Sequence, residues 1–550
     1  MPKNKYTLQI LLYYYKMVLM AITKKASIGS DAGKSLSILY LGQILGALIT
    51  VLTFVYLTRF LGPSNYGIYT FAIGFITLVS AVGNFGIGTY MSRNLSIFSH
   101  NNNVRGINET ISSSYVLVLI VAFILTVIAL ILSNFVPKIF SLNISISYLT
   151  LAIASLIIFF QMIQNVTVHA LVGFSSTKQA AITSVSVDVI QLISIILLLS
   201  LSFGVDGAVI GILIGNIIGS IVAVYFMISK ARKEPNFKII KPTKAMLSNA
   251  FNFSLPLAIN NVLNTAVQNF SILFLGFYVA SAILGNYGAA IKGLNFAAIS
   301  YGTMSIVILP LFSRASADKN GNKSKAYTKA LLYALVITLP FIIFVSAMAQ
   351  PAVYILISSK YLQAPLYLSL ITFGMALNMF AYYSGSLLAS EGFTKKMLKY
   401  NLVSIIVQLA LIFLLTPILG VFGVIIPVFI IGGILNSLLM YLALTKNIKT
   451  KISYSKIILS FISALLLYIP LSLVLLIKSS ILELILGAIL LIITYPIFII
   501  LFRVIEMSDL DKIKSITPNL PLFTTIFNFI IKYTVLLHIK INGKRKTNGE

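Results

Sequence analysis

RFLGPSNYGIYTFAIGF, at residues 59–75, opens a long apolar segment, and its tripeptide Asn65-Tyr66-Gly67 returns as Asn286-Tyr287-Gly288, 221 residues later. Further short motifs also occur twice, in the same order along the chain. They are Ser92-Arg93 with Ser313-Arg314, Thr177-Lys178 with Thr394-Lys395, and Gly204-Val205-x-Gly207 with Gly420-Val421-x-Gly423. Because the separations drift only from 216 to 221 residues, the matches indicate two copies of one unit.

The composition indicates whether these copies fold in water or in a membrane. Of the 550 residues, 59% are hydrophobic and 9% are charged, against about 45–50% and about 25% in soluble domains. Apolar runs of about 20 residues recur along the whole chain, which is typical of a polytopic membrane protein. We therefore expect an all-α fold with about 14 transmembrane helices.

The basic residues set the expected orientation. The predicted spans are 36–58, 67–88, 112–134, 147–170, 180–202, 206–228, 250–276, 284–309, 328–349, 365–388, 398–417, 421–443, 456–477 and 481–502. With the N-terminus inside, the even-numbered loops and the two tails hold 35 of the 40 Lys and Arg residues. Cytoplasmic loops are rich in these residues, so the distribution predicts that both termini are cytoplasmic.

The net charge of +28 raises the question of a nucleic-acid partner. The basic clusters lie beside predicted helix ends, where they orient the protein and attract anionic lipid, so we expect a lipid bilayer as partner and no nucleic acid. Two apolar stretches with a central Lys, residues 6–22 and 519–538, are interpreted as helices lying in the membrane interface. Their sequence leaves open whether they span the membrane.

The repeat predicts the domain organisation. Spans 1–6 and 7–12 form two six-helix lobes of the same orientation, pseudo-symmetric about an axis along the membrane normal, and spans 13 and 14 are two extra helices. The expected boundaries are 1–34 for an interfacial segment, 35–229 and 249–445 for the lobes, 230–248 for a basic linker, 446–503 for the extra helices and 504–550 for an amphipathic tail. Two lobes around a central cavity are typical of an alternating-access transporter.

Polar residues at helical spacing indicate where that cavity lies. Asn260, Asn264 and Gln268 form one stripe on span 7, and Gln43 on span 1 is the repeat equivalent of Asn264. Polar side chains within spans face protein or water rather than lipid. Such stripes favour either a solvated cavity wall or hydrogen bonds between helices.

Two charged residues lie deep within spans. Lys292, near Asn295 on span 8, supplies a positive charge for a phosphate or carboxylate, unless it forms an ion pair with Asp188 of span 5. Asp188 is then either that partner or a coupling group for a proton or a sodium ion. Arg93 and Arg314 lie at the inner mouth, as orientation signals or as a clasp for an entering phosphate.

Several site chemistries are excluded by composition. With no Cys and three scattered His, the sequence has neither disulfides nor thiol nucleophiles, and it predicts no metal site. Enzymes that act on glycans generally need carboxylates on the outer face. Because acidic residues are few and scattered, we expect no catalytic residues, no enzyme activity and no bound cofactor beyond a coupling H⁺ or Na⁺.

Residues 59–75, GIGTYMSRN at 86–94 and NFSLPLAINNVLN at 252–264 resemble the Wzx-type polysaccharide flippases. These belong to the superfamily of multidrug, oligosaccharidyl-lipid and polysaccharide exporters. The resemblance covers about residues 35–445. It implies a V-shaped pair of six-helix bundles around a cationic lumen, with Lys292 in the place where such flippases commonly carry a cation.

The resemblance implies a function. A polyprenyl-(di)phosphate-linked oligosaccharide is expected to cross from the cytoplasmic to the outer leaflet of the plasma membrane by alternating access, for assembly of cell-surface polysaccharide or glycoprotein. The alternative is an ion-coupled, MATE-like exporter of drugs or amphiphiles, although span 1 lacks the acidic residue usual in that branch. A lipid II-type flippase and a membrane glycosyltransferase are less favoured. The oligomeric state is left open, since one chain contains both lobes and a monomer suffices.

Overall fold

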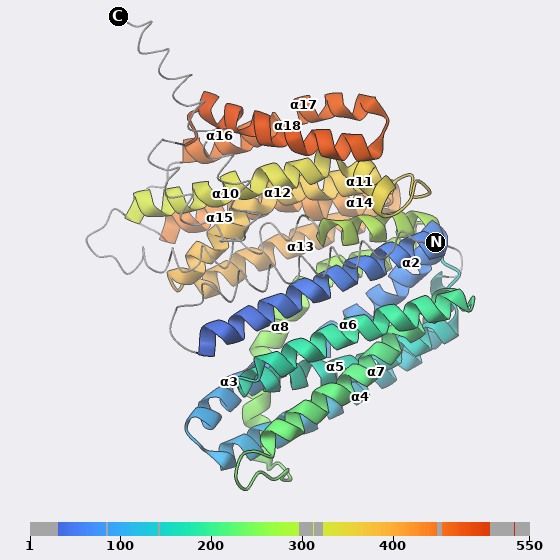
Figure 1. Cartoon of the computed structure of the whole chain (residues 1–550), viewed down its shortest axis with the longest axis vertical. Helices are drawn as coiled ribbons and strands as arrows, with labels where there is room; N and C mark the ends of the chain where they lie inside the picture. The colour runs from blue at the N-terminus through green and yellow to red at the C-terminus, as the bar shows by residue number, and fades with distance from the viewer. Residues whose placement is uncertain are drawn as a thin grey trace, which may run out of the picture. The chain divides into compact units, whose positions relative to one another are not determined.

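The computed structural model describes residues 31–83, 86–140, 143–295, 297, 312, 323–447, 454–505 and 533, and each regular element in these ranges is a helix (Figure 1). The side chains of residues 31–41, 82, 256–266, 268, 323–326, 389, 394, 395 and 447 lie outside the described part. Eleven described segments are long and apolar enough to cross a membrane, and Gly42–Ala81 covers two predicted spans. The expectation of an all-α polytopic membrane protein is confirmed.

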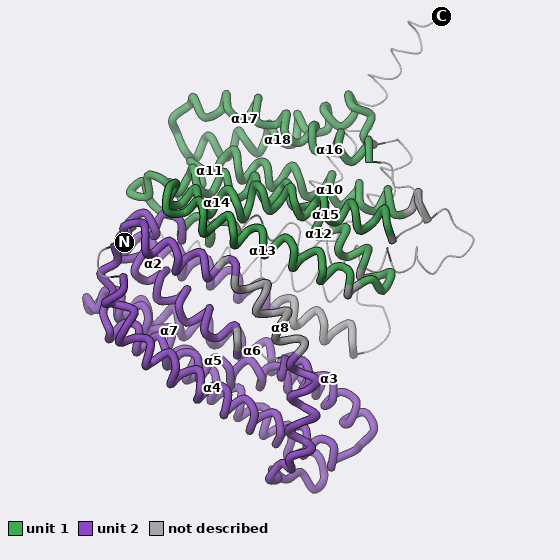
Figure 2. Tube along the Cα trace, turned by 180° about the vertical axis from the view of Figure 1, so that it is seen from behind, with its two compact units in different colours: residues 1–21, 289–550 green, residues 22–288 purple. Residues whose placement is uncertain are grey.

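The described helices form two compact units, one up to Gly288 and one from Ala289 on (Figure 2). The first contains α2 (Asp31–Gly83), α3 (Ile87–His100), α4 (Val104–Phe140), α5 (Tyr148–Gly173), α6 (Thr177–Ser200), α7 (Gly204–Ala231), α8 (Lys244–Leu275) and the beginning of a helix over 281–295. The predicted lobe boundaries stay a prediction.

The two predicted spans within α2 meet at Gly62. Its φ of 69° and ψ of 175° interrupt the helix, a conformation that glycine adopts at little cost. Pro63 then opens the next segment, where its missing N–H is not needed. Gly42 lies against Ala181, near the start of α6, and Ser92 lies against Gly173, at the end of α5. Since both of these positions belong to the same end of the unit, the chain reverses direction at Gly62.

The first unit therefore has two distinct ends. At the end that contains Arg93 and the linker of residues 232–243, which we call the basic end, Asn108 accepts from the Lys238 N–H at 3.1 Å and Ser112 accepts from the Ile240 N–H at 3.0 Å. At the opposite end Asn143 donates to the Phe277 carbonyl at 2.6 Å. Apart from Arg59 and Lys138, the described Lys and Arg residues of this unit lie toward the basic end.

The second unit consists of the rest of the helix over 281–295 and the described helices that follow. They are α10 (Lys323–Ala347), α11 (Ala349–Leu356), α12 (Ala364–Ser390), α13 (Thr394–Leu419), α14 (Phe422–Ile425), the π-helix η1 (Ile426–Ile431), α15 (Gly432–Asn447), α16 (Tyr454–Leu465), α17 (Tyr468–Val474), the 3₁₀ turn η2 (Leu475–Ile477) and α18 (Ser480–Leu501). Pro427 lacks the N–H that an α-helix needs, which accounts for the π-helix at this point.

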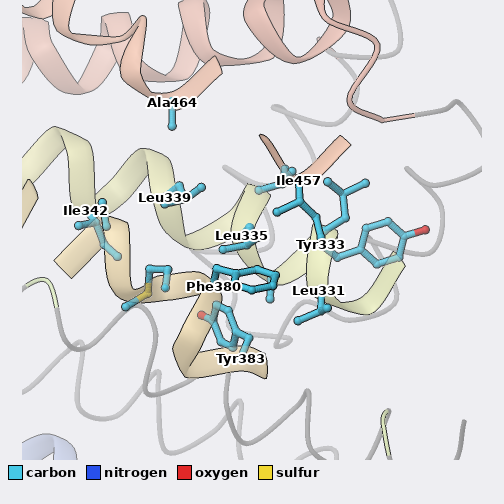
Figure 3. Close-up of a cluster of buried hydrophobic side chains, with 14 of the residues drawn as sticks. Leu331, Tyr333, Leu335, Leu339, Ile342, Phe380, Tyr383, Ile457 and Ala464 are labelled. Carbon is cyan, nitrogen blue, oxygen red and sulfur yellow. The ribbon is translucent and has the colours of Figure 1, made fainter. Parts of the chain in front are cut away.

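The core of the second unit is apolar and follows helical spacing. Leu331, Leu335 and Leu339 recur every four residues on α10 and are fully buried. In Figure 3 this row lies beside Phe380 of α12 and Ile457 of α16. This packing joins α16, from the two predicted extra helices, to the helices of the second copy.

The repeated motifs adopt the same local geometry in both units. Gly204 is the first residue of α7 and Gly420 directly follows α13, and both have a φ of 55°, which favours glycine. Three residues on, Gly207 and Gly423 pack so tightly against the preceding helix that a Cβ would contact it. The motif thus specifies a turn followed by close helix packing.

Candidate functional site

Lys292 and Asn295 lie on the exposed face of the helix over 281–295. The opposite face is formed by small buried residues, and Gly293 packs against Leu368 of α12, with 3.2 Å between an ideal Cβ and the leucine Cδ1. Lys292 is the twelfth residue of this helix, about 17 Å from its start at 1.5 Å per residue. An apolar core is about 30 Å thick, so this depth corresponds to the middle of a membrane.

Asp188 lies at the centre of α6, against α2. Its Oδ2 is 2.7 Å from the position that a Cβ would occupy on Gly46, so a larger residue there would displace this carboxylate. The side chain is half-buried, and no hydrogen bond or ion pair joins it to a described residue of its own unit. Lys292 belongs to the other unit, and the pairing of these two residues stays a prediction.

Three amide side chains extend the polar surface of the first unit. Gln43 of α2 and Gln161 and Asn165 of α5 are exposed. Gln161 lies 12 residues before the end of α5 and Asp188 lies 11 residues after the start of α6, so both are about 17–18 Å from the basic end. Because amides avoid lipid, their exposure at this depth favours a water-filled space beside them.

Two glutamines at equivalent positions of α6 and α13 join helices instead. Gln191 packs over Gly215 of α7, and Gln408 lies 2.9 Å, measured from its Nε2, from the position of a Cβ on Gly432. Gln408 also donates to the Ser404 hydroxyl at 2.8 Å. These glutamines stabilise the packing of each unit, which is the alternative that the sequence left open.

The remaining predicted site residues are distributed as follows. Arg93 is exposed on α3, with its guanidinium carbon 5.4 Å from the ring centroid of Phe253 on α8. Asn260, Asn264 and Gln268 lie within α8, but their side chains are outside the described part. Arg314 also lies outside the described residues.

The two copies of the Asn-Tyr-Gly motif meet at the opposite end of the first unit. A Cβ on Gly67 would collide with the Ser281 carbonyl, and one on Gly285 would collide with the Pro63 carbonyl. The hydroxyls of Ser64 and Ser281 are 2.9 Å apart and hydrogen-bonded. Small residues allow this close helix crossing, as is common in membranes. The sequence repeat revealed the motif, although not that its copies touch.

Solved structures of the same architecture define the class of fold. The lipid II flippase MurJ in an inward closed conformation matches with a TM-score of 0.68 and 17% identity, over 84% of this chain and 98% of the flippase chain. An inward-facing multidrug resistance MATE family transporter of the MOP superfamily matches with a TM-score of 0.57 and 18% identity, over 80% and 99%. An outward-facing MATE family transporter matches with a TM-score of 0.51 and 17% identity, over 79% and 98%. The chain therefore has the fold of MOP-superfamily transporters and is a multi-pass membrane protein.

The family follows from the sequence itself. The model of the polysaccharide biosynthesis protein family matches residues 32–316, which is more than half of the chain. The chain belongs to this family. No curated protein matches it by sequence.

Proposed function

We propose that this protein is a flippase of the plasma membrane that moves an oligosaccharide linked to a polyprenyl mono- or diphosphate from the cytoplasmic to the outer leaflet. Membership of the polysaccharide biosynthesis family supports a saccharide cargo, and the fold shared with a lipid II flippase supports a lipid-linked one. The function needs no catalytic residue, because no covalent bond of the cargo changes.

The observation that carries the proposal is the exposed Lys292 at membrane depth. A Lys at the centre of a membrane helix costs about 2.5–3.5 kcal/mol, and a different face of this helix, at Gly293, packs against α12. We expect a positive charge that is kept in the membrane at this energetic cost to bind an anionic ligand. The phosphate of the lipid carrier is the anion that this cargo brings into the membrane, and Asn295, one turn away, would bind the adjoining sugar hydroxyls.

Alternating access also requires a contact that separates. In this proposal the crossing at Gly67 and Gly285 opens to release the cargo at the opposite end of the first unit. Its backbone-to-backbone contact and the Ser64–Ser281 hydrogen bond involve few side chains, so the contact can form and separate repeatedly.

The test is a reconstituted flipping assay. Purified protein is placed in liposomes with a polyprenyl-diphosphate oligosaccharide that carries a fluorescent sugar, and dithionite reduces the label in the outer leaflet. We expect protein-dependent crossing that is lost in Lys292→Ala and retained in Lys292→Arg. Crossing by Lys292→Ala at the wild-type rate would remove this residue from the mechanism.

A second candidate function is supported by Asp188. A half-buried carboxylate at mid-membrane depth, packed beside Gly46, suits a coupling site for H⁺ or Na⁺ in an exporter of amphiphilic cations. In that case Asp188→Asn abolishes ion-driven dye efflux and Lys292→Ala leaves it intact, which is the reverse of the pattern expected for the flippase.

A further inference from the structure

One face of α2 changes from exposed to buried about halfway along its first span. Gln43, Ala47 and Thr50 share this face, since each residue turns an α-helix by about 100°, and all three are exposed. The same face then continues with apolar residues that are 3–7% exposed, namely Phe54, Leu57 and Leu61. The face therefore borders open space only in the half of the span that is nearer the basic end.

This open space contains water rather than lipid. Ile44, Leu48 and Leu52 lie on another side of α2, where all three are exposed and apolar, as expected for a side that contacts lipid. Amide side chains avoid lipid. The exposed amide of Gln43 and the exposed hydroxyl of Thr50 therefore indicate a second, hydrated side of the same helix.

Asp188 of α6 borders the hydrated side. Its carboxylate lies over Gly46, and Gly46 is within about one helical turn of both Gln43 and Thr50. Ser184, one turn before Asp188, is exposed. We call Gln43, Thr50, Ser184 and Asp188 the polar wall. It combines one amide, two hydroxyls and one carboxylate from two helices that are in contact.

The chemistry of the polar wall favours an uncharged sugar. Amide and hydroxyl groups can exchange hydrogen bonds with sugar hydroxyls, and the Ser184 hydroxyl, which donates to the Ala180 carbonyl at 3.2 Å, still accepts. Residues 43–58 and 179–200 contain no Lys or Arg, so the formal charge in these two segments is that of Asp188. A carboxylate accepts hydrogen bonds from sugar hydroxyls but repels a second anion. Such a repulsive element is a common source of specificity.

We propose that the polar wall binds the sugar of the cargo, and that Asp188 makes the flippase selective for a glycan whose sugar at this wall is uncharged, against an acidic sugar. This inference rests on the proposed function, which supplies the lipid-linked oligosaccharide, and it adds the class of sugar. The phosphate is assigned to Lys292 and not to the polar wall.

The first arm of the experiment measures the charge at the wall without any cargo. Because the chain has no Cys, Ala47→Cys introduces a single thiol on the hydrated face of α2. The whole protein in phosphatidylcholine nanodiscs is treated with cationic and anionic methanethiosulfonate reagents that do not enter lipid. We expect the cationic reagent to react faster by roughly tenfold. Asp188→Asn removes this preference. The matched control is Leu48→Cys, one residue away on the lipid side, which stays unmodified.

The second arm measures protection of the Ala47→Cys thiol by cargo. The probes are polyprenyl diphosphates that carry either glucose or glucuronic acid, two sugars that differ only at carbon 6. We expect the glucose lipid to protect at a concentration roughly tenfold lower than the glucuronic acid lipid. In Asp188→Asn the two lipids protect at similar concentrations. Polyprenyl diphosphate without a sugar leaves the thiol reactive.

Several results would overturn the proposal. Equal rates for the two reagents would show that the charge of Asp188 is neutralised, and equal protection by the two sugars would show that it does not select. Protection by the sugar-free lipid, or by none of the lipids, would show that the wall is not a sugar site. A circular-dichroism melt verifies that each variant is folded.

The outcome for this inference is distinguishable from that for the proposed function. Selective protection by the glucose lipid, with no flipping of either lipid in liposomes, would overturn the flippase and leave the sugar site standing. Flipping that is lost in Lys292→Ala, with equal protection by both sugars, would do the opposite.

Discussion

The two copies of the repeat agree in how they pack and differ in where they carry charge. Gln191 over Gly215 and Gln408 over Gly432 are the same contact, displaced by 217 residues in both partners. At the same displacement Asp188 corresponds to Ile405.

The second charge follows the same rule. With the displacement of 221, Lys292 corresponds to Phe71, which is fully buried and packs edge-on against Phe140 with ring centroids 4.8 Å apart. The fold accepts an apolar residue at either position. Each charge is therefore present in one copy only, so neither charge is needed for the architecture that the two copies share.

The largest effect is expected for Lys292, in contrast to its repeat counterpart Phe71. In Lys292→Ala we expect flipping in the liposome assay to fall by roughly 10- to 100-fold, because a hydrogen bond between two charged groups is lost, with no loss of thermal stability. Phe71→Ala should instead destabilise the protein by about 3–5 kcal/mol through the cavity that it leaves. Equal melting temperatures for the two variants would contradict this distinction.

The next prediction transplants the residue of one copy into the other. Asp188→Ile should fold with at least wild-type stability, because Ile405 is accepted at the equivalent position. Any acceleration of transport by an H⁺ or Na⁺ gradient should fall by roughly tenfold or more, since the carboxylate that binds the ion is removed. The measurement compares rates with and without each gradient. Full gradient dependence in Asp188→Ile would remove this residue from coupling.

A smaller effect is expected at the packing of glutamine over glycine that the two copies share. Gly215→Ala and Gly432→Ala should each destabilise the protein by about 1–3 kcal/mol, as expected when a packed interior receives an extra methyl group. The effect should be greater at Gly215, where the Gln191 side chain is closer. Thermal unfolding in detergent measures both variants. If one of them melts like the wild type, the two contacts are not equivalent.

The smallest effect concerns Arg93. Its contact with the Phe253 ring at 5.4 Å contributes about 0.5–1 kcal/mol at an exposed site, so Arg93→Ala should change stability by no more than that. If the residue also guides an entering phosphate, the apparent KM for the lipid rises severalfold in Arg93→Ala and recovers in Arg93→Lys. An unchanged KM leaves membrane orientation as its role.

Much of the fold could be predicted from the sequence, because the bilayer restricts a spanning segment to helical structure. Backbone groups in lipid have to be hydrogen-bonded internally, so each apolar run of sufficient length becomes a helix. The Gly204 and Gly420 motifs indicated equivalent positions in the two copies. Of the candidate site residues, Lys292 and Asp188 stood out because charge is rare within apolar runs.

The contacts between helices could not be predicted from the apolar runs. Gln191 and Asp188 lie on the same stripe of α6, yet one packs on α7 and the other lies against α2. Helical spacing predicts which residues share a face of a helix. A wide face packs against two neighbouring helices, so residues on the same face can contact different helices. A comparison of the two copies offers a signal for this difference, because Gln191 is retained in the second copy and Asp188 is not.

The sequence by itself determined the membrane environment, the helices, the duplication and the two intramembrane charges, since each depends on composition or local spacing. Only the tertiary structure decided that Gly46 faces Asp188 and that the two Asn-Tyr-Gly motifs cross. These contacts join residues 142 and about 220 positions apart. Such pairings depend on how close two helices can approach, which is set by small side chains on both of them at once.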